Sequence, residues 1–312
     1  MQPSALRDSR HLLPAGARPR PLDRVLRELL PGTSWKAVRR LIQTGKVRVN
    51  GETVLEPTQS FGGGVTIGIH PAAPSIRRAV ALKRDALIHV DPQVVVVNKP
   101  PGISTVPYED EKDTLDRQVR ALLGRGPRAG RTGSALGIVQ RLDKNTSGLI
   151  VLCRTRMAKE ALQQQFRART VHRRYLALVH GRCRSQTISS RLVSDRGDGL
   201  RGSTKNRLLG REAVTHLRVL ERFESATLVE CKLETGRTHQ IRIHLAEAGH
   251  PLVGERVYVR DFEGDVAAAS APRQMLHAAE LGFLHPVTGA TLSFEEPPPE
   301  DMQRMIARVR RR

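Results

Sequence analysis

Aromatic residues are scarce in this sequence, making up 3% of its 312 residues. A protein that reads several bases by stacking them on aromatic side chains needs more rings than this. The sequence also lacks any run of about 18 apolar residues, so we expect no membrane span. Residues 1–18 contain neither an apolar core nor a small-residue cleavage site, and they therefore do not resemble a secretory signal.

Cysteine is also rare. The three cysteines, Cys153, Cys183 and Cys231, are odd in number and far apart. Cys153 and Cys231 lie in apolar, strand-like runs, which is typical of small core residues in a reducing compartment. We therefore predict a cytoplasmic protein.

Patterns of metal ligands are missing from the sequence. His239 and His244 are five residues apart rather than four, so they do not form a ligand pair at helical spacing. The H-x-E and P-C-x-x-C signature of zinc deaminases is absent as well. We expect no bound metal.

Acidic residues are outnumbered by basic ones. The 52 Lys+Arg against 31 Asp+Glu give a formal net charge of +21, which favours a polyanionic partner. Residues 1–18 carry Arg7, Arg10 and Arg18 with a single acid, and we interpret them as a disordered basic tail. An organellar transit peptide is the alternative interpretation of this segment.

Residues 19–70 have the pattern of a compact unit. Apolar residues recur at helical spacing in two stretches: Leu22, Val25, Leu26, Leu29 and Leu30, then Ala37, Val38, Leu41 and Ile42. Pro31 and Gly32 end the first predicted helix, and Thr33 or Ser34 caps the second. The stretch VRVNGETVL, with Asn50-Gly51 at its centre, predicts a hairpin.

The second predicted helix and its exit carry a basic face that suits a phosphate backbone. Its residues are Lys36, Arg39, Arg40, Lys46 and Arg48. With PLDRVL and AVRRLIQTGKVRVNG, residues 19–70 resemble the alpha-L RNA-binding domain of the ribosomal protein S4 type. The alternative is a small helical domain whose charges are merely solvated.

The remainder of the chain has a different pattern. Residues 71–85 mix proline, alanine and basic residues and are predicted to be a linker. A buried strand is predicted at 94–97 and a helix at 157–166, while the Gly/Arg-rich residues 120–136 are predicted to be a mobile loop. Because strands outnumber helices without regular alternation, residues 86–312 are predicted to form an α+β catalytic domain with a mixed, mainly antiparallel sheet and flanking helices.

Four segments of this domain hold reactive residue types beside turn residues: VVNKPPGIST, VQRLDKNTSG, RRYLALVHG and LETGRTHQIRIHLAEAGHPLVG. Taken singly, each is a weak signal, since Lys99 fits a plain strand exit, Asp143 a turn, Tyr175 a core and His239 with Gln240 polar helix positions. In this order, with LHAAELGFLHPVTG and FEEPPPED after them, they resemble the RluA-type pseudouridine synthases. The resemblance covers roughly residues 86–300.

The resemblance implies an RNA uridine isomerase. Isomerisation of uridine to pseudouridine reuses the same atoms, so it requires no cofactor, but it needs an ionised carboxylate that acts on the ribose. Asp143 matches that residue, and whether it is a nucleophile or a base stays open. Arg242 matches the guanidinium that keeps the carboxylate charged against desolvation, with Arg237 as the rival for this role or as a phosphate contact.

The resemblance also implies how the nucleotide is held. Arg141 matches the arginine that helps displace the target nucleotide, and Tyr175 matches the tyrosine that packs on the flipped uracil. We take Lys99 as a further RNA contact. The chain departs from the family in carrying Gln140 where many members have histidine, and an arginine, at 173 or 174, where a lysine is usual.

We therefore predict a monomeric RNA pseudouridine synthase that acts on large-subunit ribosomal RNA, with transfer RNA as the alternative substrate. A catalytically inactive RNA-binding or ribosome-assembly factor is the rival function. Such a factor would have no need of Asp143, Tyr175 and Arg242 together. A glycosidase needs a pair of carboxylates, whereas the four segments do not supply such a pair.

Overall fold

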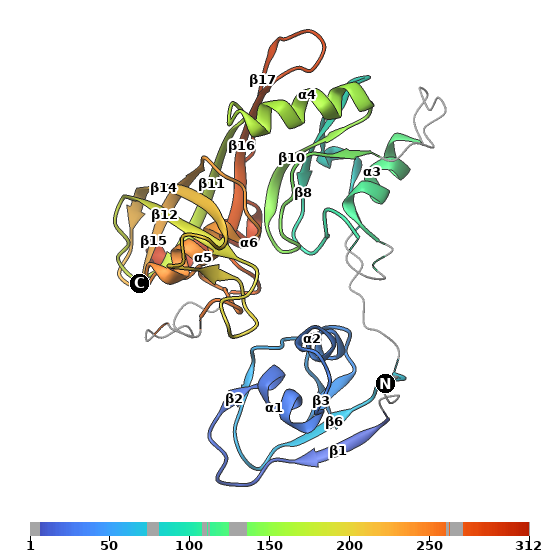
Figure 1. Ribbon diagram of the computed structural model, residues 1–312, viewed down its shortest axis with the longest axis vertical. Helices are drawn as coiled ribbons and strands as arrows, with labels where there is room; N and C mark the ends of the chain where they lie inside the picture. The colour runs from blue at the N-terminus through green and yellow to red at the C-terminus, as the bar shows by residue number, and fades with distance from the viewer. Residues whose placement is uncertain are drawn as a thin grey trace. The chain divides into compact units, whose positions relative to one another are not determined.

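The computed structural model describes residues 7–73, 81–107, 111, 113–124, 136–259, 262 and 271–311. The chain divides into two compact units, Met1–Arg78 and Ala79–Arg312, and each has a hydrophobic core of its own (Figure 1). The central part of the predicted linker, residues 74–80, lies outside the described residues. So do residues 125–135 of the predicted loop, whose first residues instead belong to a helix.

Over residues 7–73, the first unit consists of two short helices and small antiparallel sheets. Its elements are β1 (Ser9–Leu12), β2 (Arg20–Pro21), α1 (Leu22–Leu29), α2 (Trp35–Gln43), β3 (Val47–Val49), β4 (Glu52–Thr53), β5 (Ser60–Phe61) and β6 (Thr66–Ile69). Ser34 caps α2, because its Oγ accepts a hydrogen bond from the backbone N–H of Ala37. Asn50 and Gly51 both have positive φ, of 50° and 85°, as the predicted β3–β4 hairpin requires.

The expectation of a disordered tail over residues 1–18 is wrong for its described part. Ser9–Leu12 pairs antiparallel with β6, and Leu13 is buried in the core of the unit. The short stretch around Leu12 and Leu13 has too few apolar residues to show a period. Its order comes from the free edge of β6, which is distant in sequence.

In its described residues, the second unit is built on one long sheet with four α-helices and a short 3-10 helix. Its elements are η1 (Arg84–Ala86), β7 (Leu87–Val90), β8 (Val94–Lys99), α3 (Leu115–Leu123), β9 (Gly137–Ile138), β10 (Ser147–Cys153), α4 (Arg156–Arg167), β11 (His172–His180), β12 (Gln186–Val193), β13 (Gly202–Ser203), β14 (Arg211–Arg222), β15 (Ala226–Leu233), α5 (Gln240–Glu247), β16 (Leu276–Leu284), β17 (Thr291–Glu295) and α6 (Glu300–Arg310).

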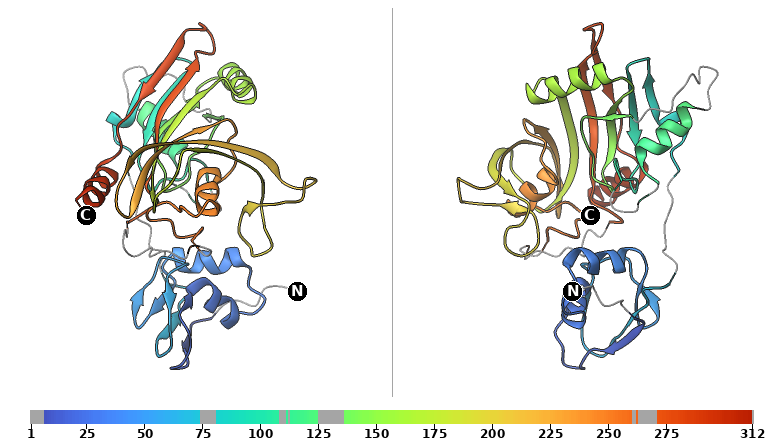
Figure 2. Two further views of the ribbon diagram at one scale, coloured as in Figure 1. Left: turned by 90° about the vertical axis from the view of Figure 1, so that its left-hand side faces the viewer. Right: turned by 45° about the vertical axis from the view of Figure 1, so that its right-hand side comes forward.

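The sheet has the order β13-β12-β14-β15-β11-β16-β10-β8-β7, with β17 beside β16 and β9 beside β10. All its strand pairs are antiparallel except β10 with β16. The predicted α+β class with a mixed, mainly antiparallel sheet is therefore confirmed. Figure 2 shows the strong twist of this sheet, which wraps around α5.

Both faces of the central strands are covered, which explains the unbroken apolar run in β8. Val95 and Val97 pack on one face, in the core that includes side chains of α3 and α5. Val94 and Val96 pack on the other face, in the core that includes side chains of α4. Because side chains alternate along a strand, four consecutive valines supply both cores. No helix among the described residues is long and apolar enough to cross a membrane.

Candidate active site

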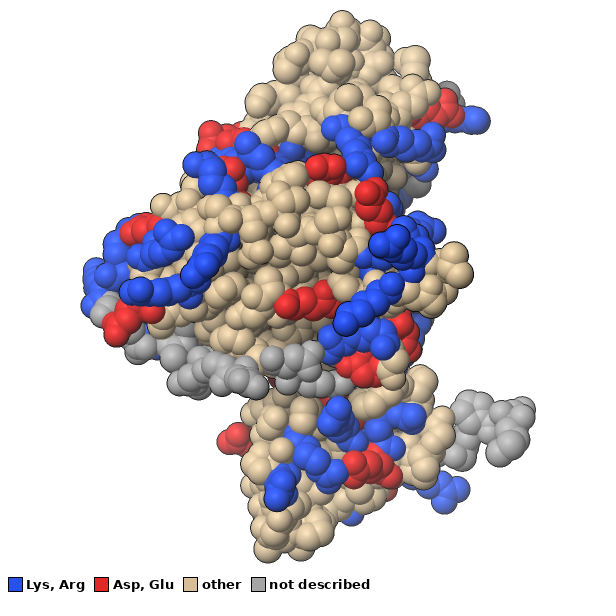
Figure 3. Space-filling model, turned by 60° about the vertical axis from the view of Figure 1, so that its left-hand side comes forward, with Lys and Arg blue, Asp and Glu red and all other residues tan. Residues whose placement is uncertain are grey.

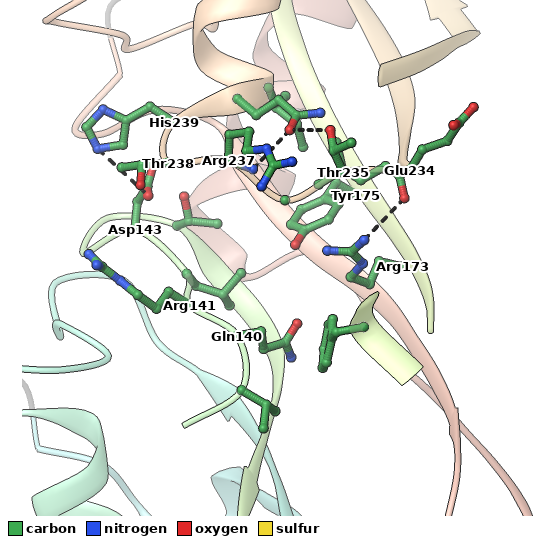
Figure 4. Close-up of a pocket in the computed structure, with 18 of the residues that line it drawn as sticks. Gln140, Arg141, Asp143, Arg173, Tyr175, Glu234, Thr235, Arg237, Thr238 and His239 are labelled. Carbon is green, nitrogen blue, oxygen red and sulfur yellow. Dashed lines mark hydrogen bonds and ion pairs between the residues drawn. The ribbon is translucent and has the colours of Figure 1, made fainter. Parts of the chain in front are cut away.

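A cavity of about 700 Å³ lies between several parts of the second unit. Its walls come from β9 and the turn before β10, from the end of α4, from β11, and from the segment between β15 and α5 together with the first turn of α5. Figure 4 shows Asp143, Tyr175 and His239 around this space. The predicted residues Arg141, Arg237 and Arg242 line it as well.

Asp143 stands in a turn that feeds directly into β10. The carbonyl of Asp143 accepts a hydrogen bond from the N–H of Thr146, and Gly148 has φ +112°. A Cβ at Gly148 would lie 2.2 Å from the carbonyl oxygen of Ala278, so only glycine lets β10 approach β16 here. The turn therefore holds Asp143 at the edge of the cavity, with 23% of its side chain exposed.

Lys99 does not reach solvent, and the prediction that it contacts RNA is wrong. The residue is completely buried, and its Nζ donates hydrogen bonds to the carbonyls of Pro100, Ile103 and Lys144 at 2.9–3.0 Å. Burial lowers the pKa of Lys99 to about 7. Lys144 directly follows Asp143 in the chain. The hydrogen bond from Lys99 to the carbonyl of Lys144 therefore stabilises the turn that carries the Asp143 carboxylate.

Arg242, on α5, lies between two carboxylates. Its Nη1 donates to Oδ2 of Asp143 at 3.1 Å, while Nε and Nη2 donate to the two oxygens of Glu255, each at 2.8 Å. Burial alone would lower the pKa of Arg242, but Glu255 and then Asp143 outweigh it and raise that pKa. The bidentate contact with Glu255 fixes the guanidinium in one orientation.

Glu255 was not predicted as a site residue. It is 4% exposed, and although burial would raise its pKa, Arg242 and the backbone N–H groups of Val257 and Arg256 lower it. The only signal for it in the sequence was its place in the segment GHPLVGERVY. Nothing in the spacing of that segment pairs Glu255 with Arg242.

Arg237 does not take the role of Arg242. Its Nε donates to the carbonyl of Glu212 at 2.9 Å, and its backbone N–H donates to Oε1 of Gln240 at 3.0 Å. Gln240 is buried and also bonds Thr235, so this network holds the start of α5 in place. Arg237 thus stays on the wall of the cavity.

His239 immediately precedes α5 and has a left-handed backbone, with φ +60°. Its Nδ1 lies 2.6 Å from the hydroxyl oxygen of Tyr258, and its Nε2 lies 3.8 Å from Oδ1 of Asp143. Burial lowers the pKa of His239 to about 4, so the imidazole is neutral at pH 7. Sequence patterns suggested only a polar helix position here, and Tyr258 gave no signal of its own.

Two residues of β11, Arg173 and Tyr175, line the cavity. Tyr175 is 7% exposed and belongs to the hydrophobic core below the cavity. Arg173 also faces the cavity, with its guanidinium 5.4 Å from the ring centre of Phe166. Arg174 lies on the other side of the strand and pairs with Glu280 and Glu295. Of the two arginines, Arg173 is therefore the one at the cavity.

Gln140 and Arg141 form the part of the turn that leads to Asp143. Arg141 is exposed at the cavity, which leaves its guanidinium accessible to a ligand. The side chain of Gln140 also lines the cavity, and its Nε2 is buried without a hydrogen-bond partner among the described residues. A buried donor of this kind is a candidate contact for a polar group of the substrate.

The predicted basic face of the first unit is present, with one qualification. Lys36, Arg40 and Arg48 are exposed, and Lys46 is half-buried. Arg39 instead donates to Oδ2 of the buried Asp23 at 2.9 Å and lies over the ring of Trp35. Figure 3 shows lysine and arginine side chains in several patches, with acidic side chains among them.

Comparisons with known proteins agree with the two-part organisation. The sequence profile of the RNA pseudouridylate synthase family matches residues 93–247, and that of the S4 domain matches residues 20–67. The ribosomal large subunit pseudouridine synthase D of Xylella fastidiosa is 39% identical over 96% of this chain and 91% of its own length. An uncharacterized RNA pseudouridine synthase of Bacillus subtilis is 37% identical, over 93% of this chain and 94% of its own.

A solved structure supports the same fold. Human RNA pseudouridylate synthase domain containing 4 superimposes with a TM-score of 0.59, covers 72% of this chain and 93% of its own, and is 24% identical.

Proposed function

This chain belongs to the family of RNA pseudouridine synthases, and from that premise we propose that it isomerises uridines of large-subunit ribosomal RNA with Asp143 as its catalytic carboxylate. One observation carries the proposal: Asp143 stands at a cavity lined by Tyr175 and is bound there by Arg242. A factor that only binds RNA has no use for a carboxylate oriented in this way. The geometry therefore favours an enzyme over an inactive assembly factor.

The chemistry asks little of the protein beyond one carboxylate. The bond between C1′ and N1 of the uridine breaks, the uracil turns, and a bond between C1′ and C5 forms. The hydrogen on C5 leaves, and N1 gains one, so the atoms balance without a cofactor. Asp143 acts on the ribose either as the nucleophile at C1′ or as a base, and its position at the cavity suits both roles.

Two neighbours prepare Asp143 for this role. Arg242 donates to Oδ2 and is itself held by Glu255, so the carboxylate is oriented before substrate arrives. If the hydroxyl of Tyr258 donates to Nδ1 of His239, the proton of the neutral ring sits on Nε2, which faces Oδ1 of Asp143. Both oxygens then face donors.

Other residues at the cavity would hold the flipped nucleotide. The ring of Tyr175 offers a surface for the uracil, and Arg141 is accessible to enter the space that the nucleotide leaves. Arg173 and Arg237 on the cavity wall suit the phosphates on either side. Lys36, Arg40 and Arg48 of the first unit would add contacts to the RNA backbone.

The choice of substrate follows the relatives. Several of them are named ribosomal large subunit pseudouridine synthases, which makes ribosomal RNA the first candidate and transfer RNA the alternative. We propose that the protein modifies this RNA in the cytoplasm, where bacterial ribosomes are located, and that it does so as a monomer.

Mapping of pseudouridine in total RNA, with and without this gene, tests the proposed function. We expect a defined set of positions in large-subunit ribosomal RNA to lose its signal, and purified protein to restore it on the unmodified RNA without added cofactor. A signal lost only from transfer RNA would reassign the substrate. Unchanged maps together with an inactive purified protein would refute the activity.

Replacing Lys36, Arg40 and Arg48 by alanine should weaken RNA binding and lower its salt dependence. Each lost phosphate contact reduces the slope of log K against log salt by about 0.7–0.9. The measurement is a salt titration of RNA affinity for the triple variant. Glu52→Gln, an exposed change in the same unit, is the control. An unaltered slope in the triple variant would show that this face does not contact RNA.

A further inference from the structure

The loop between β13 and β14, residues 204–210, displays two consecutive leucines to solvent. Leu208 is 91% exposed and Leu209 is 53% exposed. Isolated exposed leucines are common on protein surfaces and need no explanation. These two, however, are the only adjacent pair among the large exposed hydrophobic residues that the structure describes, and Leu208 is the most exposed of them.

The loop is held in one conformation. The side chain of Asn206 accepts a hydrogen bond from the N–H of Leu208 at 2.9 Å. Arg191, on β12, donates to the carbonyls of Leu209 and Gly210 at 2.8 and 2.9 Å. Gly210 has φ +71°, and a Cβ there would lie 2.9 Å from the carbonyl oxygen of Leu192. The backbone is thus fixed while the leucines stay outside, which is how a protein presents a contact residue.

The charges around the leucines indicate what they meet. Lys205, Arg207 and Arg211 are exposed on either side of them. An acidic protein surface would match the basic residues but not the leucines, and an apolar protein surface would match the leucines but not the charges. RNA matches both, because phosphates pair with the basic groups and an opened base step accepts an apolar wedge.

The loop is also close to the cavity. The backbone carbonyl of Glu212 accepts a hydrogen bond from Arg237, and the carboxylate of Glu212 pairs with Arg169. Both arginines line the cavity. Leu208 is four positions before Glu212 in the chain, a span of at most about 14 Å for an extended chain. RNA that places a nucleotide in the cavity therefore passes within reach of the loop.

We propose that loop 204–210 is a second RNA-binding element, in which Leu208 and Leu209 insert against bases near the target uridine while Lys205, Arg207 and Arg211 bind the neighbouring phosphates. This inference rests on the proposed function. In this proposal the leucines of the loop contact the bases that are unstacked when the target uridine is flipped out. These contacts offset part of the free energy that base extraction costs.

The test compares Leu208→Ser/Leu209→Ser with Arg207→Ala on unmodified ribosomal RNA from cells that lack the gene. The leucine variant should lower kcat/KM about tenfold and leave the salt slope of RNA affinity unchanged, because it removes apolar contact only. Arg207→Ala should lower that slope by about 0.7–0.9. Val287→Ser is the matched control, since Val287 is 53% exposed in the turn between β16 and β17. It should change neither quantity.

The outcomes are distinguishable. A leucine variant with wild-type kcat/KM on RNA would overturn the inference and leave the proposed function standing. A defect that appears in cells but not with purified RNA would overturn it too, because the loop would then bind a protein. Wild-type protein that is inactive on the same RNA would overturn the proposed function and this inference with it.

Discussion

Replacement of Asp143 by asparagine should abolish pseudouridine formation, with a fall in kcat of at least about 10³-fold. The amide has nearly the same shape, but it is neither a nucleophile nor a base at this position. It also withdraws the charge to which Arg242 donates, at 3.1 Å. Release of the C5 hydrogen from RNA labelled at that atom measures the reaction directly.

RNA affinity separates the loss of chemistry from a loss of binding. Asp143→Asn should bind RNA at least as well as the wild type, since it removes a negative charge near a polyanion. Glu111→Gln is the matched control, because Glu111 forms an ion pair with Lys144, the residue that follows Asp143 in the turn. It should retain kcat within about twofold, as expected for an ion pair that is partly exposed, with 55% of the Lys144 side chain and 26% of the Glu111 side chain accessible. Substantial turnover by Asp143→Asn would remove the mechanism proposed here.

Replacement of Arg242 by methionine should reduce both activity and stability. The buried carboxylate of Glu255 would lose its bidentate partner, and leaving such a charge unpaired costs about 3–5 kcal/mol of unfolding free energy. The carboxylate of Asp143 would lose its orienting donor, and we expect kcat to fall about 10²-fold or more. Urea denaturation and single-turnover kinetics give the two quantities separately.

A second variant shows whether the loss of activity is only a loss of folding. In Arg242→Met/Glu255→Met both buried charges are gone, so the unfolding free energy should return toward that of the wild type. The rate should stay low, because Asp143 still lacks its guanidinium. Recovery of both stability and rate in the double variant would show that Arg242 acts only on the fold.

The sequence by itself determined the two-part organisation and the class of the second unit. Local patterns predict individual elements. The helical spacing after Leu22 predicts a helix, Asn50-Gly51 predicts a hairpin turn, and the valines at 94–97 predict a buried strand. The family resemblance of the motifs pointed to Asp143 and Tyr175, and to Arg242 with Arg237 as its rival, and the structure places all four around one cavity.

Only the tertiary structure decided which charges meet. Alternation along β11 puts Arg173 and Arg174 on opposite sides, but packing determines which side carries the cavity. Arg237 and Arg242 are both near α5 in sequence, and the fold alone aims the second at Asp143 and Glu255. Lysine is usually a surface residue, yet Lys99 is buried and its Nζ donates hydrogen bonds to three backbone carbonyls. Local patterns fix the faces of helices and strands, whereas the partner of a charged group depends on segments that come together only when the chain has folded.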